Sequence, residues 1–222
     1  LGSRLPPPGL LQALAAAAAR RPEAVTPWLA ERLPGATAEL HQPLGELLGR
    51  HGGDAPSSPD ARVGHALGLL ARDATAGSAA VVGILADAEL SPRQRQEALE
   101  AFDRAPGDLF LERAREALDA GGGTAELAWV FHDLGQPEDA PRVARLLAAH
   151  DYDVANAAVD ALAGVLARGE LGEHAAPTRA AVREALRLLR AEHPAGQNRL
   201  ADGLAEALGE LEADLSPPAS SP

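Results

Sequence analysis

Apolar residues recur at three- and four-residue spacing along almost the whole chain, in segments of about 10 to 20 residues. Alanine and leucine fill most of these positions, with 50 Ala and 35 Leu against ten Val and one Ile. Both residues favour helices, whereas the β-branched and aromatic residues that favour strands are scarce. The pattern therefore predicts an all-α fold and argues against a sheet.

Proline and glycine divide the pattern into individual helices. A capping residue followed by Pro marks helix starts at Thr26-Pro27, Ser58-Pro59 and Ser91-Pro92, and Gln94 completes a capping box with Ser91. Glycines such as those at 52–53 mark helix ends. Together these signals predict twelve helices, over residues 9–20, 26–33, 38–51, 59–72, 78–88, 92–104, 108–119, 125–134, 139–149, 154–168, 175–192 and 196–212.

Two segments of the chain, 78–102 and 139–166, share one pattern of apolar positions in two helices joined by a turn. Val82 matches Val143 at an offset of 61 residues, and the second helices match at an offset of 63. The difference of two residues falls in the turn, where insertions are tolerated. Because one further helix pair lies between the segments, the repeating unit has roughly 31 residues.

The second segment carries the more specific pattern. Pro141 begins a helix that ends in Leu-Leu, Asp151 and Asp153 form an acidic turn, and Val154 opens an alanine-rich helix containing Ala-Ala-Val-Asp-Ala-Leu. This segment resembles a HEAT repeat, although Ala155 stands where the family usually has a basic residue. The resemblance implies a right-handed α-solenoid of about six antiparallel helix pairs, a single domain over 4–215, and a non-enzymatic scaffold for protein partners.

The two ends of the chain lie outside the predicted helical domain. Leu1-Gly2-Ser3 resembles the scar of a cleaved fusion vector, and the chain contains no Met, so we expect residues 1–3 to be foreign. Residues 216–222 are predicted to be a disordered Pro/Ser tail. No apolar run approaches 18 residues, which predicts a chain without a membrane span; we expect it to be cytoplasmic.

Composition narrows the possible partners and chemistry. The net charge of -12 argues against nucleic acid and anionic membranes as partners. The absence of Cys excludes disulfides, thiolate metal sites and a cysteine nucleophile. All 20 basic residues are Arg, which points to GC-rich coding DNA and a bacterial source.

Four arginines of the predicted helix 175–192 fall on one face, and acidic residues follow at the same spacing in the next helix. An anion-binding or partner-binding stripe is one interpretation. We favour interhelical ion pairs, because the residue numbers of two facing residues in an antiparallel hairpin always add up to the same total. The pairs that sum to 389 are Arg179 with Glu210, Arg183 with Glu206 and Arg187 with Asp202.

Large and titratable side chains collect near the best repeat, at Trp129, His132, Asp133 and Tyr152. We expect Trp129 to pack in the core, with a partner-binding aromatic anchor as the next interpretation. An aromatic residue beside a carboxylate also resembles the site of HEAT-like alkylpurine DNA glycosylases, and bilin lyases are a second enzymatic relative. The acidic charge disfavours the glycosylase, which must bind phosphate.

Other catalytic and metal patterns are absent from the sequence. The His-Glu pairs of HEAT-like di-iron hydroxylases do not occur, and no two His stand four apart. The turn 150–153 is predicted to be a helix cap with Asp153 at the N-cap, although its carboxylates could bind a cation weakly. No Gly-x-Ser-x-Gly elbow is present. We therefore expect no catalytic residue, no metal and no cofactor.

Overall fold

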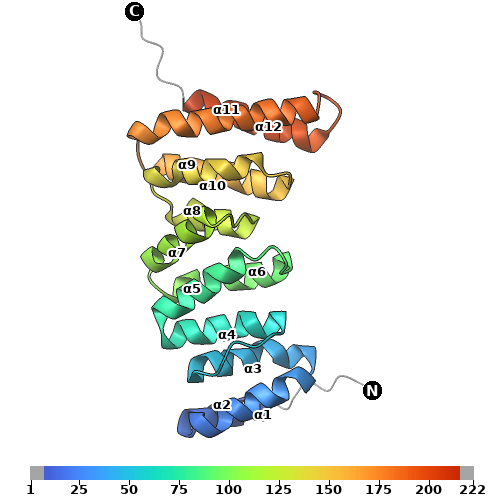
Figure 1. Ribbon diagram of the computed structural model, residues 1–222, viewed down its shortest axis with the longest axis vertical. Helices are drawn as coiled ribbons and strands as arrows, with labels where there is room; N and C mark the ends of the chain where they lie inside the picture. The colour runs from blue at the N-terminus through green and yellow to red at the C-terminus, as the bar shows by residue number, and fades with distance from the viewer. Residues whose placement is uncertain (1–7, 216–222) are drawn as a thin grey trace, which may run out of the picture. The chain divides into compact units, whose positions relative to one another are not determined.

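A computed structural model describes residues 8–215, so the predicted vector scar and the Pro/Ser tail lie outside the described residues. The described chain is all-helical, as the spacing predicts, and contains no strand (Figure 1). The α-helices are α1 Pro8–Arg20, α2 Pro22–Arg32, α3 Ala38–His51, α4 Pro59–Arg72, α5 Ala74–Leu85, α6 Pro92–Leu99, α7 Gly107–Asp119, α8 Ala125–Leu134, α9 Ala140–Ala144, α10 Tyr152–Arg168, α11 Ala175–Glu192 and α12 Arg199–Asp214. Short 3₁₀ helices are η1 Leu33–Gly35, η2 Phe102–Arg104, η3 Pro137–Asp139, η4 Arg145–Ala148 and η5 Gly172–His174.

The chain divides into two compact units, Leu1–Arg113 and Ala114–Pro222, where we expect one domain over 4–215. The division falls inside α7, so this helix contributes residues to both units.

Several predicted helix starts are confirmed, and others are wrong, among them the helix predicted from 78, which begins at Ala74. Ser91 forms the predicted capping box with Gln94. Thr26 does not start a helix: α2 already begins at Pro22, and the Thr26 hydroxyl donates to the Pro22 carbonyl. Asp151, not Asp153, caps α10, because its carboxylate accepts from the next two free backbone amides at 2.8 and 3.5 Å.

Unit 1 contains a helix pair, α3 and α4, in unusually close contact (Figure 1). A Cβ added at Gly45 would lie 2.1 Å from the Ala61 carbonyl oxygen, and one at Gly49 would lie 2.0 Å from that of His65. Gly45 and Gly49 are four residues apart on α3, and their partners Ala61 and His65 are four residues apart on α4 in the same order along the chain. The two helices are therefore parallel, which corrects the prediction that 38–51 and 59–72 form an antiparallel pair.

Parallel helices need a connection that runs back along their length, and residues 52–58 supply it. Gly52 leaves α3 in the left-handed region at φ 82°. The loop is fixed to both helices: the Ser58 hydroxyl lies 3.0 Å from His41 Nδ1, and His65 Nε2 lies 2.9 Å from the Gly53 carbonyl oxygen. This loop is thus a crossover between parallel helices.

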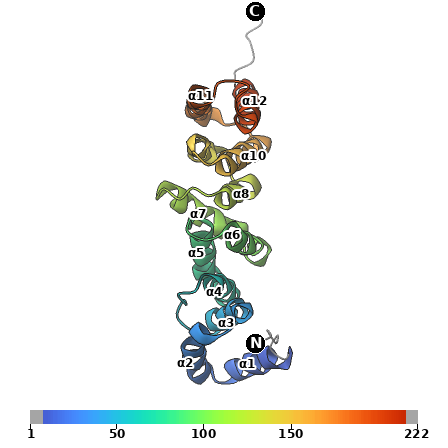
Figure 2. The same ribbon diagram turned by 90° about the vertical axis from the view of Figure 1, so that its right-hand side faces the viewer.

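Unit 2 has two layers of helices (Figure 2). One layer consists of α8, α10 and α12, with α10 in the middle; the other contains α9 and α11. A Cβ added at Gly164 of α10 would lie 2.6 Å from the carbonyl oxygen of His132 near the end of α8, so the carboxyl-terminal parts of these neighbouring helices lie side by side.

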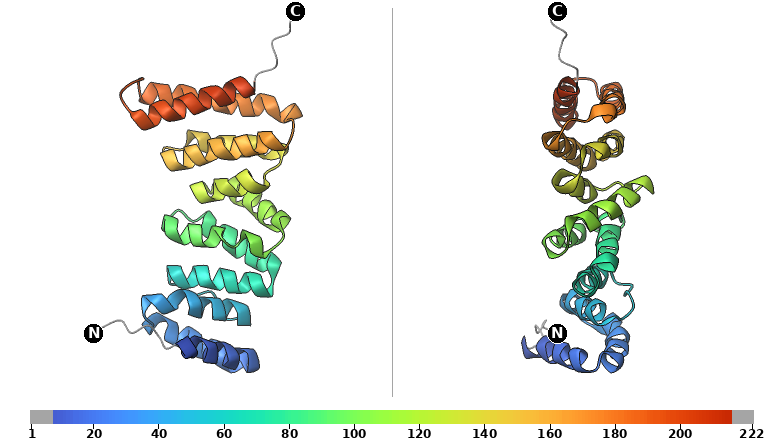
Figure 3. Two further views of the ribbon diagram at one scale, coloured as in Figure 1. Left: turned by 180° about the vertical axis from the view of Figure 1, so that it is seen from behind. Right: turned by 90° about the vertical axis from the view of Figure 1, so that its left-hand side faces the viewer.

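The last hairpin, α11 and α12, forms as predicted but in another register (Figure 3). Its turn occupies residues 193–198, because Asn198 caps α12 through its side-chain oxygen. The helix therefore starts three residues later than expected, at Arg199, and every contact across the hairpin moves with it.

This shift makes the predicted ion pairs wrong. Arg183 donates from Nε to Glu212 at 2.5 Å in place of Glu206. Arg187 pairs with Glu184 of its own helix and not with Asp202, whose carboxylate accepts from the Gly196 backbone amide. Arg179 donates to the Leu215 carbonyl and not to Glu210.

Candidate interaction surface

Helix α8 presents one narrow stripe to solvent. Thr124 starts the helix by accepting from the Leu127 amide at 3.1 Å, and Gly135 ends it. Most side chains of α8 are buried, including Phe131, which has no exposed surface. Trp129 and His132 are half-buried and Asp133 is exposed. The aromatic and titratable residues of α8 thus share its exposed side.

The three side chains contact one another in sequence. The rings of Trp129 and His132 meet edge to face with centroids 4.9 Å apart at 69°. His132 Nδ1 lies 2.6 Å from Asp133 Oδ1. Arg168 of α10 donates to the His132 carbonyl, which is one of the helix-end carbonyls that lack a partner within α8. The arrangement holds a half-exposed indole in a fixed orientation beside a carboxylate.

Tyr152, the fourth predicted residue of this group, lies elsewhere. It begins α10, whereas the contacts to His132 come from Gly164, twelve residues or about 18 Å along the helix. Its hydroxyl accepts from Asn198 Nδ2 at 3.1 Å, and its ring centroid lies 6.0 Å from that of His193. Tyr152 lines a separate cleft of about 210 Å³ between η4 with the loop that follows it, α11 and α12.

The two layers of unit 2 carry opposite charge. Helices α8, α10 and α12 contain nine carboxylates and only two arginines, Arg168 and Arg199. Helices α9, η4 and α11 contain six arginines and only two carboxylates, Glu184 and Glu192. The acidic net charge of the chain is therefore concentrated on one layer of this unit.

Two acidic residues on the exposed side of this layer were not recognised as one surface, and only Asp153 was considered, as a helix cap and weak cation ligand. Asp153 and Asp160 of α10 are exposed, and neither forms an ion pair within residues 8–215. Their separation of seven residues, two helical turns, is the sequence signal that could have found them. Glu210 of α12, predicted to pair with Arg179, is also exposed and without an ion pair in the described part of the chain.

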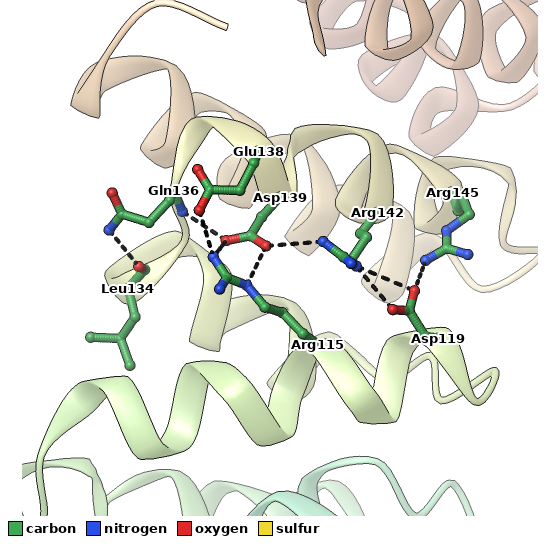
Figure 4. A network of polar contacts seen from close by, with 8 residues as sticks. All are labelled: Arg115, Asp119, Leu134, Gln136, Glu138, Asp139, Arg142 and Arg145. Carbon is green, nitrogen blue, oxygen red and sulfur yellow. Dashed lines mark hydrogen bonds and ion pairs between the residues drawn. The ribbon is translucent and has the colours of Figure 1, made fainter.

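The strongest polar cluster of unit 2 holds helices together (Figure 4). Arg115 of α7 donates to both carboxylate oxygens of the fully buried Asp139, at 2.6 and 2.8 Å. Asp119 accepts from Arg145 at 2.6 Å and from Arg142 at 3.1 Å. Hydrogen bonds from these two arginines, Arg145 first, lower the pKa of Asp119. With its charges paired internally, this cluster is structural.

The described residues offer little catalytic chemistry. Among residues 8–215, no three His, Asp or Glu side chains lie together in a way that could hold a metal ion. The same part of the chain contains no helix that is both long and apolar enough to cross a membrane. No protein-family model, curated protein or solved structure matches the chain.

Proposed function

We propose that the protein is a cytoplasmic, non-enzymatic HEAT-like scaffold that binds a protein partner, or another segment of its parent chain, through the exposed side of α8. Trp129 is the anchor of this surface, with His132 and Asp133 beside it. The proposal rests chiefly on one observation: Trp129, in edge-to-face contact with His132, is half-exposed on a helix whose Leu127, Val130 and Phe131 are fully buried.

Physical chemistry supports an anchoring role for this residue. Tryptophan is enriched among the residues that dominate binding energy, because its large apolar area needs little ordering on binding. The contact with His132 reduces the rotational freedom of the ring before a partner arrives. Tyr152 belongs to a different cleft, so we place it outside the primary surface.

A HEAT-like enzyme, such as an alkylpurine DNA glycosylase-like or bilin-lyase-like module, is the alternative. The glycosylase needs an aromatic and a carboxylate in one pocket on a surface that tolerates phosphate. Trp129 and Asp133 lie instead on the acidic layer of unit 2, and Tyr152 lies at the other end of α10. The scaffold is therefore the better-supported function.

Site-specific photocrosslinking tests the proposal. A photoreactive amino acid replaces Asp133, and in a matched protein it replaces Glu173, whose side chain is 91% exposed in η5. Both proteins are irradiated in a lysate of the encoding organism. We expect one stoichiometric crosslinked protein from position 133 alone. Its loss with Trp129→Ala and its retention with Trp28→Ala, the other tryptophan and 45% exposed, would support the anchor.

Circular dichroism must confirm that the Trp129→Ala protein is folded. Because Trp129 is half-buried, the exposed Asn156→Arg change on α10 serves as a second variant that blocks the surface without a cavity. A crosslink that survives both changes, or that forms equally from position 173, would overturn the proposal.

A further inference from the structure

We infer that the exposed side of the α8, α10 and α12 layer binds a basic, arginine-containing peptide segment of the partner protein. This inference rests on the proposed function and names the chemistry of its partner. The surface, called the acidic band below, consists of Trp129 and Asp133 of α8, Asp160 of α10 and Glu210 of α12. All four residues are exposed or half-buried.

The helix register brings the acidic band together. The carbonyl of His132 lies beside Gly164, an offset of 32 residues between α8 and α10. The Tyr152 hydroxyl binds Asn198, an offset of 46 residues between α10 and α12. These offsets place Trp129 level with Asp160, and Asp133 level with Glu210 to within one turn.

The carboxylates of the acidic band point away from the packed side of their helices. Asp160 is two residues from Ala158 and from Leu162, both fully buried, so it lies on the opposite face of α10. Glu210 is likewise two residues from the fully buried Leu208 of α12. Asp160 and Glu210 form no ion pair within residues 8–215, and Asp133 pairs only with His132 there. Their charge is available to a partner.

In the other layer, which contains α9 and α11, most of the charged side chains are already paired. Its arginines are largely engaged: Arg142 and Arg145 bind Asp119, and Arg183 binds Glu212. The exposed side of the acidic layer thus attracts cations. An arginine guanidinium can stack on the indole of Trp129 and pair with Asp133 or Asp160, which a neutral or acidic segment cannot do.

The spacing of the helices sets the length of the segment. Packed helix axes lie about 8 to 10 Å apart, so three helices span about 16 to 20 Å from first to last. An extended peptide covers this distance with roughly six residues. A segment of this length with arginine at alternate positions would meet Trp129, Asp160 and Glu210 in turn.

Hexa-arginine peptide is the probe for the test, with hexaglutamate as the control peptide. In a Trp28→Phe background, Trp129 is the only tryptophan, so its fluorescence reports binding at the acidic band. We expect hexa-arginine to perturb this fluorescence saturably and hexaglutamate to leave it unchanged. Raising the salt from low to physiological ionic strength should weaken binding, because exposed charges are screened.

Substitutions then locate the site. Asp160→Asn and Glu210→Gln should each weaken binding by about two- to fivefold, the range of exposed ion pairs. Trp129→Leu, followed by calorimetry, should weaken it by about threefold through loss of the cation contact. Glu173→Gln removes the same charge at a residue of η5, outside the acidic layer, and should leave the affinity unchanged.

Three results would overturn the inference: no saturable binding of hexa-arginine, binding without a change in Trp129 fluorescence, or equal weakening by Glu173→Gln and Asp160→Asn. The last result would indicate attraction to the net charge of -12 alone. If the position-133 crosslink depends on Trp129 while hexa-arginine fails to bind, the proposed function stands and only the basic partner is wrong.

Discussion

The guanidinium of Arg115 binds both oxygens of the buried Asp139 carboxylate, at 2.6 and 2.8 Å. This bidentate pair joins α7 to the start of α9, and Arg142 adds a third contact at 3.6 Å. Hydrogen bonding to Asp139 raises the pKa of Arg115. Because Asp139 has no exposed surface, its charge is tolerated only with these partners.

Asp139→Ala should therefore destabilise unit 2 strongly. Removing one member of a buried ion pair costs about 3 kcal/mol, because the other charge loses its partner. Here Arg115 is 30% exposed and can recover some hydration, which reduces the loss. Urea unfolding followed by circular dichroism measures the change. Asp119→Ala, at an exposed carboxylate of α7, is the control, and a midpoint shift as large as that of Asp139→Ala would contradict the structural role of the buried pair.

Asp119 makes a separate prediction about acid. Its pKa is lowered by hydrogen bonds from Arg145 and then Arg142, so the unfolded chain binds this proton more readily than the folded one. The stabilisation is present at neutral pH and falls as the pH drops below the ordinary value of 3.8. Thermal midpoints of the native chain and Asp119→Asn should differ at pH 7, and the difference should shrink as the pH falls below 3.8. High salt should shrink the difference at pH 7, because the site is exposed; a difference that persists in acid would contradict the assignment.

The close contact of α3 and α4 predicts opposite effects of alanine at two helix glycines. A Cβ at Gly49 would lie 2.0 Å from the His65 carbonyl oxygen, so Gly49→Ala forces the helices apart at a cost of about 1 to 3 kcal/mol. A Cβ at Gly83 in α5 would meet nothing within 4 Å. Gly83→Ala should therefore stabilise the same unit by about 0.5 to 1 kcal/mol. Equal effects of the two changes in urea unfolding would contradict the observed packing.

Local signals predicted the helices well, because their causes are local. The helix over 125–134 was predicted to the residue, since Thr124 supplies a cap and Gly135 an end. Contacts between helices depend on loops, which periodicity does not determine. A start of α12 at Arg199 in place of the predicted 196 was enough to replace Glu206 by Glu212 as the partner of Arg183.

The relative direction of α3 and α4 was also not predictable from local sequence patterns. Gly45 and Gly49 stand four apart in α3, as Gly64 and Gly68 do in α4, a spacing that allows close approach of helix backbones. These glycines lie inside the predicted helices, and their spacing alone does not distinguish a parallel pair from the antiparallel pair that the resemblance implied. The site was predictable in the same partial way: adjacency along α8 brought Trp129, His132 and Asp133 together, whereas Tyr152 required the length of α10 to be known.

Asn198 makes two kinds of contact that substitution can separate. Its side-chain oxygen accepts from the Leu200 and Ala201 amides at 3.0 and 3.4 Å, and its Nδ2 donates to the Tyr152 hydroxyl. Asn198→Ala loses both and should cost about 1 to 2 kcal/mol, most of it from the cap. Asn198→Ser keeps a capping oxygen and loses the donor, so it should cost about 0.5 to 1 kcal/mol, as Tyr152→Phe should.

A double-mutant cycle in urea unfolding decides between the two contacts. If the donor to Tyr152 accounts for the loss in Asn198→Ser, the combined Asn198→Ser and Tyr152→Phe protein should be little less stable than either single variant, because both remove one hydrogen bond. Additive losses would mean that the hydrogen bond contributes nothing. The offset of 46 residues, which brings Asp160 to within one turn of Glu210, rests on this hydrogen bond and would then lack energetic support.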